Sequence, residues 1–306
     1  MRRRPCLPVR TLVDGYMTGD PPEVLLLGDS VSVRVAHEDS DKTDLAGMVA
    51  RELLPRMRTC SIAASGYHAG VFLEVVRLLE AMPHRPRLIV LPINLRSFFP
   101  QWDLNPVWAY ERTIGAIRRY GRLPGRMVPK VLPEHASRRA HRRYLAAELS
   151  NPALPGRTIG EISDVIARAP ETDQEQIDRQ RVIFAFHYLH VLDAAHLRLA
   201  AVHDTIRIAT SLGIPVVAYV VPVNYEGGRY LVGTGFTECL TSNVLVVRDA
   251  VDRASGPPGV GFFDWSTLLT AEAFFHRFEP SEHLNEQGRR TLAARIATAV
   301  RQRFTV

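Results

Sequence analysis

Residues that could carry out acyl-transfer chemistry stand in four separate parts of this 306-residue chain. A serine hydroxyl becomes a nucleophile when a neighbouring base, most often a histidine, takes its proton. Backbone and amide N–H groups can then stabilise the oxyanion that forms on the attacked carbonyl. The residues of these types that the spacing singles out are, in chain order, Ser30, Gly66, Asn94 and His283. They fall at chain positions that can converge at one edge of a parallel sheet.

Each of these residues also has a plain structural reading. Ser30 alone is compatible with a helix cap, since Asp and Ser are common capping residues. Asn94 is compatible with a turn, Gly66 with a loop, and His283 is one of 11 histidines in the chain. The chemical reading is favoured because all four stand where an expected helix or strand begins or ends.

The elements that must position these residues alternate between strands and helices. Short apolar runs predict strands at Val24–Gly28, Thr59–Ala63, Leu88–Ile93, 215–221 and Val260–Asp264. Helical patterns lie at 43–57, 68–82, 192–213 and 285–304, with Thr43 as the expected cap of the first and Gly213 ending the third. This order predicts an α/β fold of three layers with a flavodoxin-like parallel sheet. Ligands bind beyond the carboxyl ends of such strands, where the polar residues can converge.

Four blocks of the sequence, in order, resemble those of the SGNH (GDSL) hydrolase family, which is named for its Ser, Gly, Asn and His. The stretch "GDSVS" at 28–32 matches the first block closely, and a lone Gly66 stands at the place of the second. The third block, usually Gly-x-Asn-Asp, reads "PINL" at 92–95. The fourth, usually Asp-x-x-His with Leu-Asn-x-x-Gly after it, ends in "HLNEQG" at 283–288, with Pro280 at the aspartate position. The resemblance covers the core strands at both ends of the chain.

This resemblance implies a single SGNH-type domain over 1–306 that acts as an esterase or an O-acyltransferase without cofactor or metal. Ser30 would form an acyl-enzyme, with His283 as the base. The oxyanion donors would be the backbone N–H groups of Ser30 and Gly66 and the amide of Asn94. The substrate would be an ester-bearing small molecule, a glycan or a carrier-bound acyl donor. The alternative is a catalytically silent SGNH-fold binding protein, which the departures in the third and fourth blocks favour.

The group that orients His283 is open, because Pro280 replaces the aspartate. A catalytic histidine needs an acceptor at Nδ1 to fix its tautomer. Glu279 lies one residue further back, but its side chain is one methylene longer than that of aspartate. Glu282 adjoins His283 and qualifies only if the loop turns sharply there. A backbone carbonyl or a distant acid such as Asp264 is the third alternative.

Substrate-binding residues are expected on the loops after the third and fourth strands. The first loop offers Arg96 and Trp102, and the second offers Asn224 and Tyr225. The functional reading is a pocket for an acyl group or a sugar, with Arg96 holding an anionic group. The structural reading is ordinary loop packing.

The segment from about 102 to 180 predicts a mostly helical insertion after the third strand. Its part from 112 to 143 contains ten Lys or Arg and one acid, Glu134, in a chain whose net charge is +6. This charge is either a solvated helical face or a docking surface for an acidic carrier or donor, such as a phosphorylated carrier, a nucleotide-bearing donor or an anionic glycan. No zinc-finger or RNP-type signature accompanies it, which argues against nucleic acid.

Composition excludes several other classes. No apolar run approaches the roughly 18 residues of a membrane span. The first 23 residues start with basic residues but lack the apolar centre of a signal peptide, so a cytoplasmic protein is expected. Cys6, Cys60 and Cys239 are far apart and form no CxxC pair, so neither a disulfide framework nor a zinc site is expected.

Overall fold

The computed structural model describes residues 19–122 and 134–304. Its strands are β1 (Val24–Gly28), β2 (Thr59–Ala63), β3 (Leu88–Ile93), β4 (Val216–Val220) and β5 (Val260–Asp264). Its α-helices are α2 (Ser30–Val33), α3 (Leu45–Leu53), α4 (Ala69–Leu78), α5 (Pro100–Leu104), α6 (Glu111–Arg122), α7 (Arg138–Leu145), α8 (Ile159–Ala167), α9 (Asp173–Tyr188), α10 (Leu197–Ser211), α11 (Tyr225–Val232), α12 (Thr234–Ala254) and α13 (Glu286–Phe304). Short 3₁₀ helices are η1 (Leu79–Ala81), η2 (Leu95–Phe98) and η3 (Ala271–Ala273).

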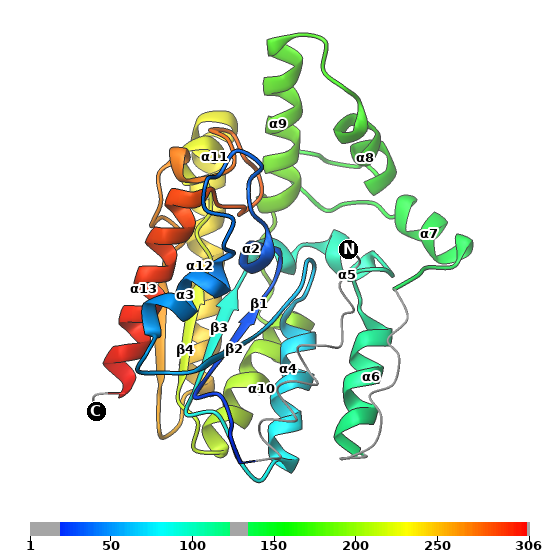
Figure 1. Ribbon diagram of the computed structural model, residues 1–306. Helices are drawn as coiled ribbons and strands as arrows, with labels where there is room; N and C mark the ends of the chain where they lie inside the picture. The colour runs from blue at the N-terminus through cyan, green and yellow to red at the C-terminus, as the bar shows by residue number, and fades with distance from the viewer. Residues whose placement is uncertain (1–18, 123–133, 305–306) are drawn as a thin grey trace.

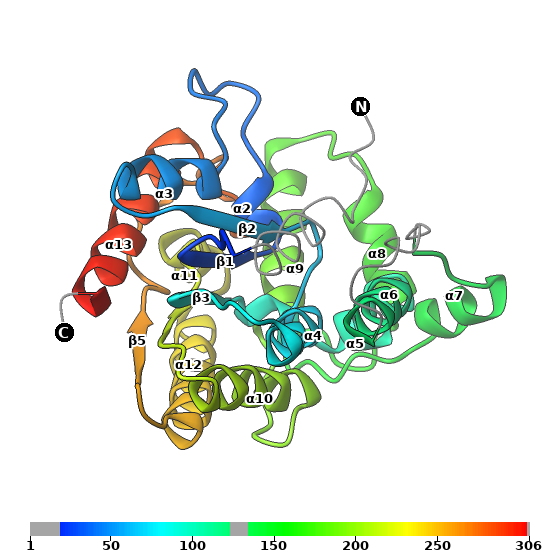
Figure 2. The ribbon, with the colours of Figure 1, turned by 60° about the horizontal axis from the view of Figure 1, so that its bottom comes forward.

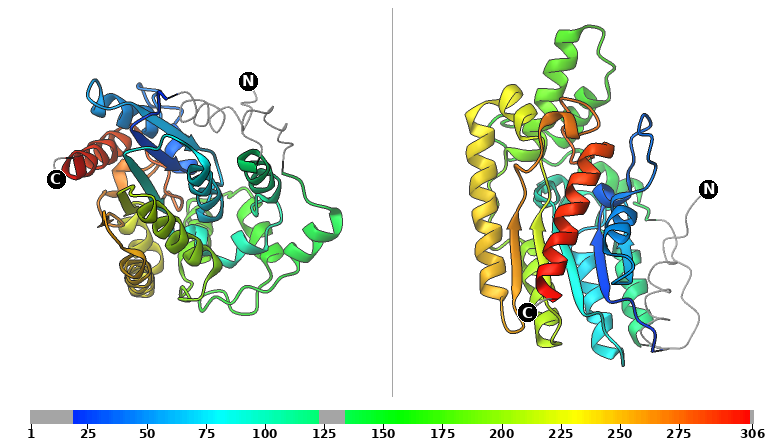
Figure 3. Two further views of the ribbon diagram at one scale, coloured as in Figure 1. Left: turned by 90° about the horizontal axis from the view of Figure 1, so that it is seen from below. Right: turned by 60° about the vertical axis from the view of Figure 1, so that its left-hand side comes forward.

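The strands form one parallel sheet in the order β2-β1-β3-β4-β5, as the alternation of elements predicts. Helices α3 and α13 cover one face of the sheet, and α4, α10 and α12 cover the other (Figures 1, 2 and 3). The α/β class is therefore confirmed, with helices on both faces of a parallel sheet. Four strands have the predicted bounds, and β4 is one residue shorter at each end.

The buried faces of β1 explain its unbroken apolar run. Leu25 and Leu27 pack with the helices of one layer, and Val24 and Leu26 pack with those of the other. All four side chains are 5% exposed or less. A parallel strand covered on both faces has no polar side to show, so its sequence does not alternate.

The strand order reverses between β1 and β3, because the chain passes from β1 to β2 on one side and then to β3 on the other. Ligand sites of open parallel sheets lie at such a switch point, beyond the carboxyl ends of the strands. α2 begins with Ser30 directly after β1, and Asn94 caps η2 directly after β3. Two of the predicted site residues therefore flank the switch point.

In the described residues between 102 and 180, helices α5 to α9 are joined by loops, with one isolated antiparallel bridge between Glu148 and Thr158. This region lies on the side of the molecule away from α13 (Figures 1 and 2). Arg126 and Lys130 of the predicted basic surface lie outside the described residues, as do Cys6 and the basic N-terminal start.

Two features of the helix ends bear on the sequence predictions. Asp44, and not Thr43 as predicted, caps α3, because the Asp44 carboxylate accepts a hydrogen bond from the backbone N–H of Gly47 at 2.8 Å. Gly213 follows α10 with φ +75, a conformation that glycine adopts without strain. Of the helices in the described ranges, none has the length and apolar character to cross a bilayer.

Candidate active site

A tight turn joins β1 to α2 and places Ser30 at the strand end. A Cβ on Gly28 would lie 2.6 Å from Ser32 Cβ and 2.8 Å from Ala63 Cβ, so only glycine lets α2 fold back here. Asp29 caps the helix, since its Oδ1 accepts from the backbone N–H of Val31 at 2.8 Å. Ser30 is therefore not the cap, and its buried side chain is not needed for that purpose.

The side chain of Asn94 connects the loop of Ser30 with the loop of His283. Its Nδ2 donates to Asp29 Oδ2 at 2.8 Å and to Glu282 Oε2 at 3.3 Å. Asp29 directly precedes Ser30, and Glu282 directly precedes His283. Asn94 thus brings these two parts of the chain together, although more than half of the sequence separates them.

The same two bonds bear on the predicted role of Asn94. A primary amide has two N–H groups, and both are engaged by carboxylates in this arrangement. Its Oδ1 accepts from the backbone N–H of Arg96 at 3.0 Å. Asn94 can therefore donate to an oxyanion only if it gives up one of these bonds, and the longer one, to Glu282, is the weaker.

Glu282 is fully buried and points away from His283 into a polar cluster. Arg96 Nη2 lies 2.9 Å from its Oε2, and the Tyr188 hydroxyl donates to its Oε1. Arg96 was predicted to hold an anionic substrate group, but here it neutralises Glu282. Glu282 was one candidate for orienting His283, and its bonds go to Arg96, Tyr188 and Asn94 instead.

Burial shapes the protonation of this cluster. It raises the pKa of Asp29, and the nearby charge of Glu282 adds to that rise, while the hydrogen bond from Asn94 opposes it. Burial also raises the pKa of Tyr188 well above its ordinary value, with a further contribution from Glu282. Tyr188 therefore keeps its proton and acts as a donor. The cluster contains two carboxylates and only one guanidinium, that of Arg96.

His283 is linked to the other candidate carboxylate, Glu279, through the hydroxyl of Ser281. Its Nδ1 lies 2.7 Å from the hydroxyl oxygen of Ser281, and this hydroxyl is hydrogen-bonded to Glu279 Oε1. Glu279 Oε1 itself is 3.9 Å from Nδ1, too far for a direct hydrogen bond. The second oxygen of Glu279 pairs with Nε2 of His276 at 2.9 Å. Of the two candidate carboxylates, Glu279 is therefore the one that is linked to Nδ1 of His283.

The imidazole of His283 is in the neutral form at pH 7. Burial and the positive charges of Arg96 and Arg34 together lower its pKa to about 3, although the charge of Glu279 opposes them. Its Nε2 is buried and has no hydrogen-bond partner. Among the described residues no hydrogen bond joins Ser30 to His283.

Gly66 has a positive φ and lies directly against Tyr110. Its φ is +85, and a Cβ there would lie 2.7 Å from the Tyr110 hydroxyl oxygen. That hydroxyl donates to the carbonyl of Ser65 at 2.5 Å. Because Ala63 pairs with Gly28 in the sheet, the Gly66 loop leaves the same edge as Ser30. No hydrogen bond between Gly66 and Ser30 is found in the described part of the chain.

The remaining predicted binding residues are packed into the structure. Asn224 caps α11 and donates to the carbonyls of Arg277 and Glu279 at 2.9 and 3.2 Å, so it anchors the loop that carries Glu279. Tyr225 contacts Phe236, with ring centroids 6.3 Å apart. These contacts fit the structural reading of this loop.

Trp102 is also buried and contacts Trp108, with ring centroids 4.4 Å apart and ring planes tilted by 36°. The guanidinium carbons of Arg96 and Arg198 lie 5.7 and 5.8 Å from its ring. Trp102 therefore packs against Arg96 and supports the cluster around Glu282.

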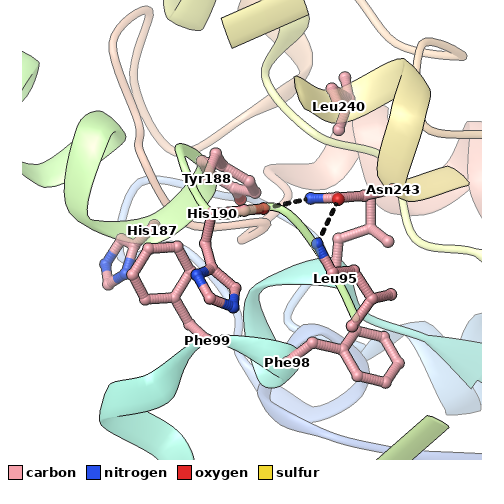
Figure 4. Close-up of a pocket in the computed structure, with 9 residues that line it drawn as sticks. Leu95, Phe98, Phe99, His187, Tyr188, His190, Leu240 and Asn243 are labelled. Carbon is pink, nitrogen blue, oxygen red and sulfur yellow. Dashed lines mark hydrogen bonds between the residues drawn. The ribbon is translucent and has the colours of Figure 1, made fainter. Parts of the chain in front are cut away.

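A narrow cavity lies between η2, the end of α9 and α12 (Figure 4). It has about 10 Å³ of room for the centre of a water molecule, which is enough for about one water. Asn243 bounds it by donating to the carbonyl of His190 at 2.7 Å and accepting from the N–H of Leu192 at 2.8 Å. Its other lining residues include Leu95, Phe98, Phe99, His187, Tyr188 and Leu240.

Sequence reasoning did not single out Ser281 or Tyr188. Ser281 could have been noticed, because it stands two residues after Glu279 and two before His283. Tyr188 gave no such signal, since it lies at the end of α9, far along the chain from Glu282.

Within residues 19–122 and 134–304, no group of three or more His, Cys, Asp or Glu side chains could hold a metal ion. Cys60 and Cys239 are free thiols. The chain matches no known protein family and no curated protein sequence. Its function must therefore be argued from the geometry of this site.

Proposed function

We propose that this protein is an SGNH-type serine hydrolase or O-acyltransferase that acts through a Ser30 acyl-enzyme. The substrate is an ester-bearing small molecule, a glycan or a carrier-bound acyl donor. The observation that carries this proposal is the Asn94 side chain, which ties the neighbour of Ser30 to the neighbour of His283 at the switch point of the sheet. The neutral imidazole of His283, whose buried Nε2 has no hydrogen-bond partner, supports it.

In the proposed reaction, Ser30 Oγ bonds to the ester carbonyl carbon while His283 Nε2 takes the hydroxyl proton. The C–O bond to the leaving alcohol then breaks, and His283 returns the proton to that oxygen. Water or an acceptor hydroxyl attacks the acyl-Ser30 ester with the same proton transfers, and free Ser30 is regenerated. Hydrolysis and transfer differ only in this second acceptor.

We assign stabilisation of the oxyanion to the backbone N–H groups of Ser30 and Gly66, with Asn94 as a third donor. Asn94 would join by exchanging its 3.3 Å bond to Glu282 for one to the oxyanion. Its bond to Asp29 would stay in place and keep the two loops together.

The turnover of p-nitrophenyl acetate at different pH values tests this proposal. His283 acts as a base only when neutral, and its pKa lies well below the ordinary value. Activity is therefore lost only as the pH falls through this lowered pKa. We expect kcat/KM to stay level from about pH 8 to about pH 5, with its acid limb below that. An acid limb at pH 6.5 or above, or no turnover at all, would contradict the proposal.

The arginines of α7 support a docking surface for an acidic acyl donor. The side chains of Arg138, Arg139, Arg142 and Arg143 are all exposed. None of the four forms an ion pair with a carboxylate in the described part of the chain. Clustered, unpaired positive charge attracts anionic molecules and raises their rate of association.

Acetyl-coenzyme A and p-nitrophenyl acetate carry the same acetyl group and differ in charge, so they test this surface. We expect reversal of the four α7 arginines to glutamate to lower kcat/KM for acetyl-coenzyme A at least about tenfold. Turnover of p-nitrophenyl acetate should not change, and the difference should shrink at 1 M salt. An equal loss on both substrates would instead show damage to the fold.

The second candidate function is a catalytically silent binding protein with the same fold. The observation that favours it is the engagement of both Asn94 N–H groups by carboxylates. Such a protein would bind esters without turning them over.

A further inference from the structure

The hydroxyl of Ser281 lies between His283 and Glu279. We propose that Ser281 is a positioning residue that links these two side chains and holds the His283 proton on Nδ1. Its catalytic importance rests on the function proposed above, whereas the position of the proton does not. This assignment replaces a direct His–carboxylate contact with a contact through one neutral hydroxyl.

The distances allow this link and exclude the direct one. Nδ1 of His283 is 2.7 Å from Ser281 Oγ but 3.9 Å from Glu279 Oε1. Ser281 is further held by its backbone N–H, which donates to the same carboxylate oxygen at 3.2 Å. All three residues are 9% exposed or less, so water does not readily replace these contacts.

The direction of the hydrogen bonds follows from counting protons. A serine hydroxyl has one hydrogen, and an ionised carboxylate can only accept. The Ser281 hydrogen therefore goes to Glu279, and Ser281 Oγ must accept from His283. That requires the hydrogen of the neutral imidazole to be on Nδ1, which leaves the lone pair on Nε2.

Glu279 is ionised because several donors surround it. Burial alone would raise its pKa, but hydrogen bonds from His276 and Ser281 lower it below the ordinary value. His276 is half exposed and pairs with the outer oxygen of Glu279 at 2.9 Å. Asn224 donates to the Glu279 carbonyl and holds the backbone in place.

Among the described residues, Ser281 is the one hydrogen-bond partner of His283 Nδ1. Arg96 and Arg34 are positively charged and disfavour a second proton on the imidazole. Burial lowers the pKa of His187 well below its ordinary value, so His187 is neutral too. The ring of Phe275 packs on His283 with centroids 5.3 Å apart. Ser281 is thus the acceptor that selects the tautomer.

Two-bond ¹H–¹⁵N correlation spectra of the full-length protein at pH 7 test this inference without any substrate. The His283 signals are assigned by their loss in His283→Gln. We expect a protonated Nδ1 and an unprotonated Nε2 in the wild type and in Ser281→Thr, which keeps the hydroxyl. In Ser281→Ala we expect the proton to move to Nε2 in a large part of the molecules.

Ser266→Ala is the matched control. Ser266 is a buried serine whose hydroxyl donates to a carboxylate two residues earlier, Asp264, at 2.6 Å, but it has no bond to His283. This variant should leave the His283 tautomer unchanged. A wild-type His283 protonated on Nε2, or a tautomer unaffected in folded Ser281→Ala, would overturn the proposal. If Ser281→Ala does not fold, the wild-type and Ser281→Thr spectra still test the proposal. Protonation of His283 on Nε2 in either protein would overturn it.

Kinetics separate this inference from the proposed function. On p-nitrophenyl acetate, Ser281→Ala should lose kcat on the order of 10²-fold or more with little change in KM, and Ser281→Thr should restore it. Absence of ester turnover in the wild type would contradict the proposed function and leave the tautomer result standing. Full activity in Ser281→Ala would overturn the positioning role itself.

Discussion

Replacing Ser30 with alanine is expected to lower kcat for short p-nitrophenyl esters at least ~10³-fold. The physical reason is that Ser30 Oγ forms the bond to the carbonyl carbon, so its removal leaves only binding and oxyanion stabilisation. Asp29, and not Ser30, caps α2, so the temperature of thermal unfolding should stay close to that of the wild type. Steady-state kinetics and calorimetry on the same preparations measure the two quantities.

Ser32→Ala is a matched control for this substitution. Ser32 is a buried serine in the same short helix, two residues further along. It should keep kcat within tenfold of the wild-type value. Activity of Ser30→Ala within tenfold of wild type would exclude a serine mechanism.

Replacing Arg96 with methionine is expected to destabilise the protein by about 3–5 kcal/mol at pH 7. Arg96 is the guanidinium that faces the buried carboxylates of Glu282 and Asp29. Its removal leaves them without a compensating charge, whereas methionine preserves most of the side-chain volume. Urea unfolding measures the free energy of unfolding.

The pH dependence of Arg96→Met gives a second signature. Burial raises the pKa of Asp29 and the charge of Arg96 opposes that rise, so loss of this charge moves the pKa of Asp29 in the folded state further above its unfolded value. The folded state then binds more protons, so the stability deficit should shrink as the pH is lowered from 7 towards 5. Arg253→Met removes an exposed ion pair with Asp249 on α12 and should cost less than about 1 kcal/mol. Equal effects of the two substitutions would contradict the role given to Arg96.

The strands could be predicted from the sequence because each is a short apolar run bounded by turn residues. A central parallel strand such as β1 is buried on both faces, so its apolar and polar residues do not alternate. Only its apolar composition then indicates a strand. The cap of α3 was predicted wrongly as Thr43, because neighbouring Thr43 and Asp44 are both good caps and only the geometry of the turn decides between them.

The candidate site could be predicted only in part. Ser30 and Asn94 follow strands that flank a switch point, so their proximity follows from the topology. The partner of Arg96 could not be predicted, because Glu282 reaches it from the other end of the chain. The sequence also left Glu279 and Glu282 as alternatives. The structure distinguishes the two. Glu282 is buried against Arg96 and Tyr188, whereas Glu279 accepts a hydrogen bond from Ser281.

Labelling with a fluorophosphonate probe tests most directly whether Ser30 is an activated nucleophile. In this reaction Ser30 Oγ bonds to phosphorus, fluoride leaves, and His283 takes the hydroxyl proton. Peptide mapping by mass spectrometry should place one label on Ser30 of the folded wild-type protein and none on His283→Gln. Folded wild-type protein that stays unlabelled at Ser30 would contradict the proposed function and favour the silent binding protein.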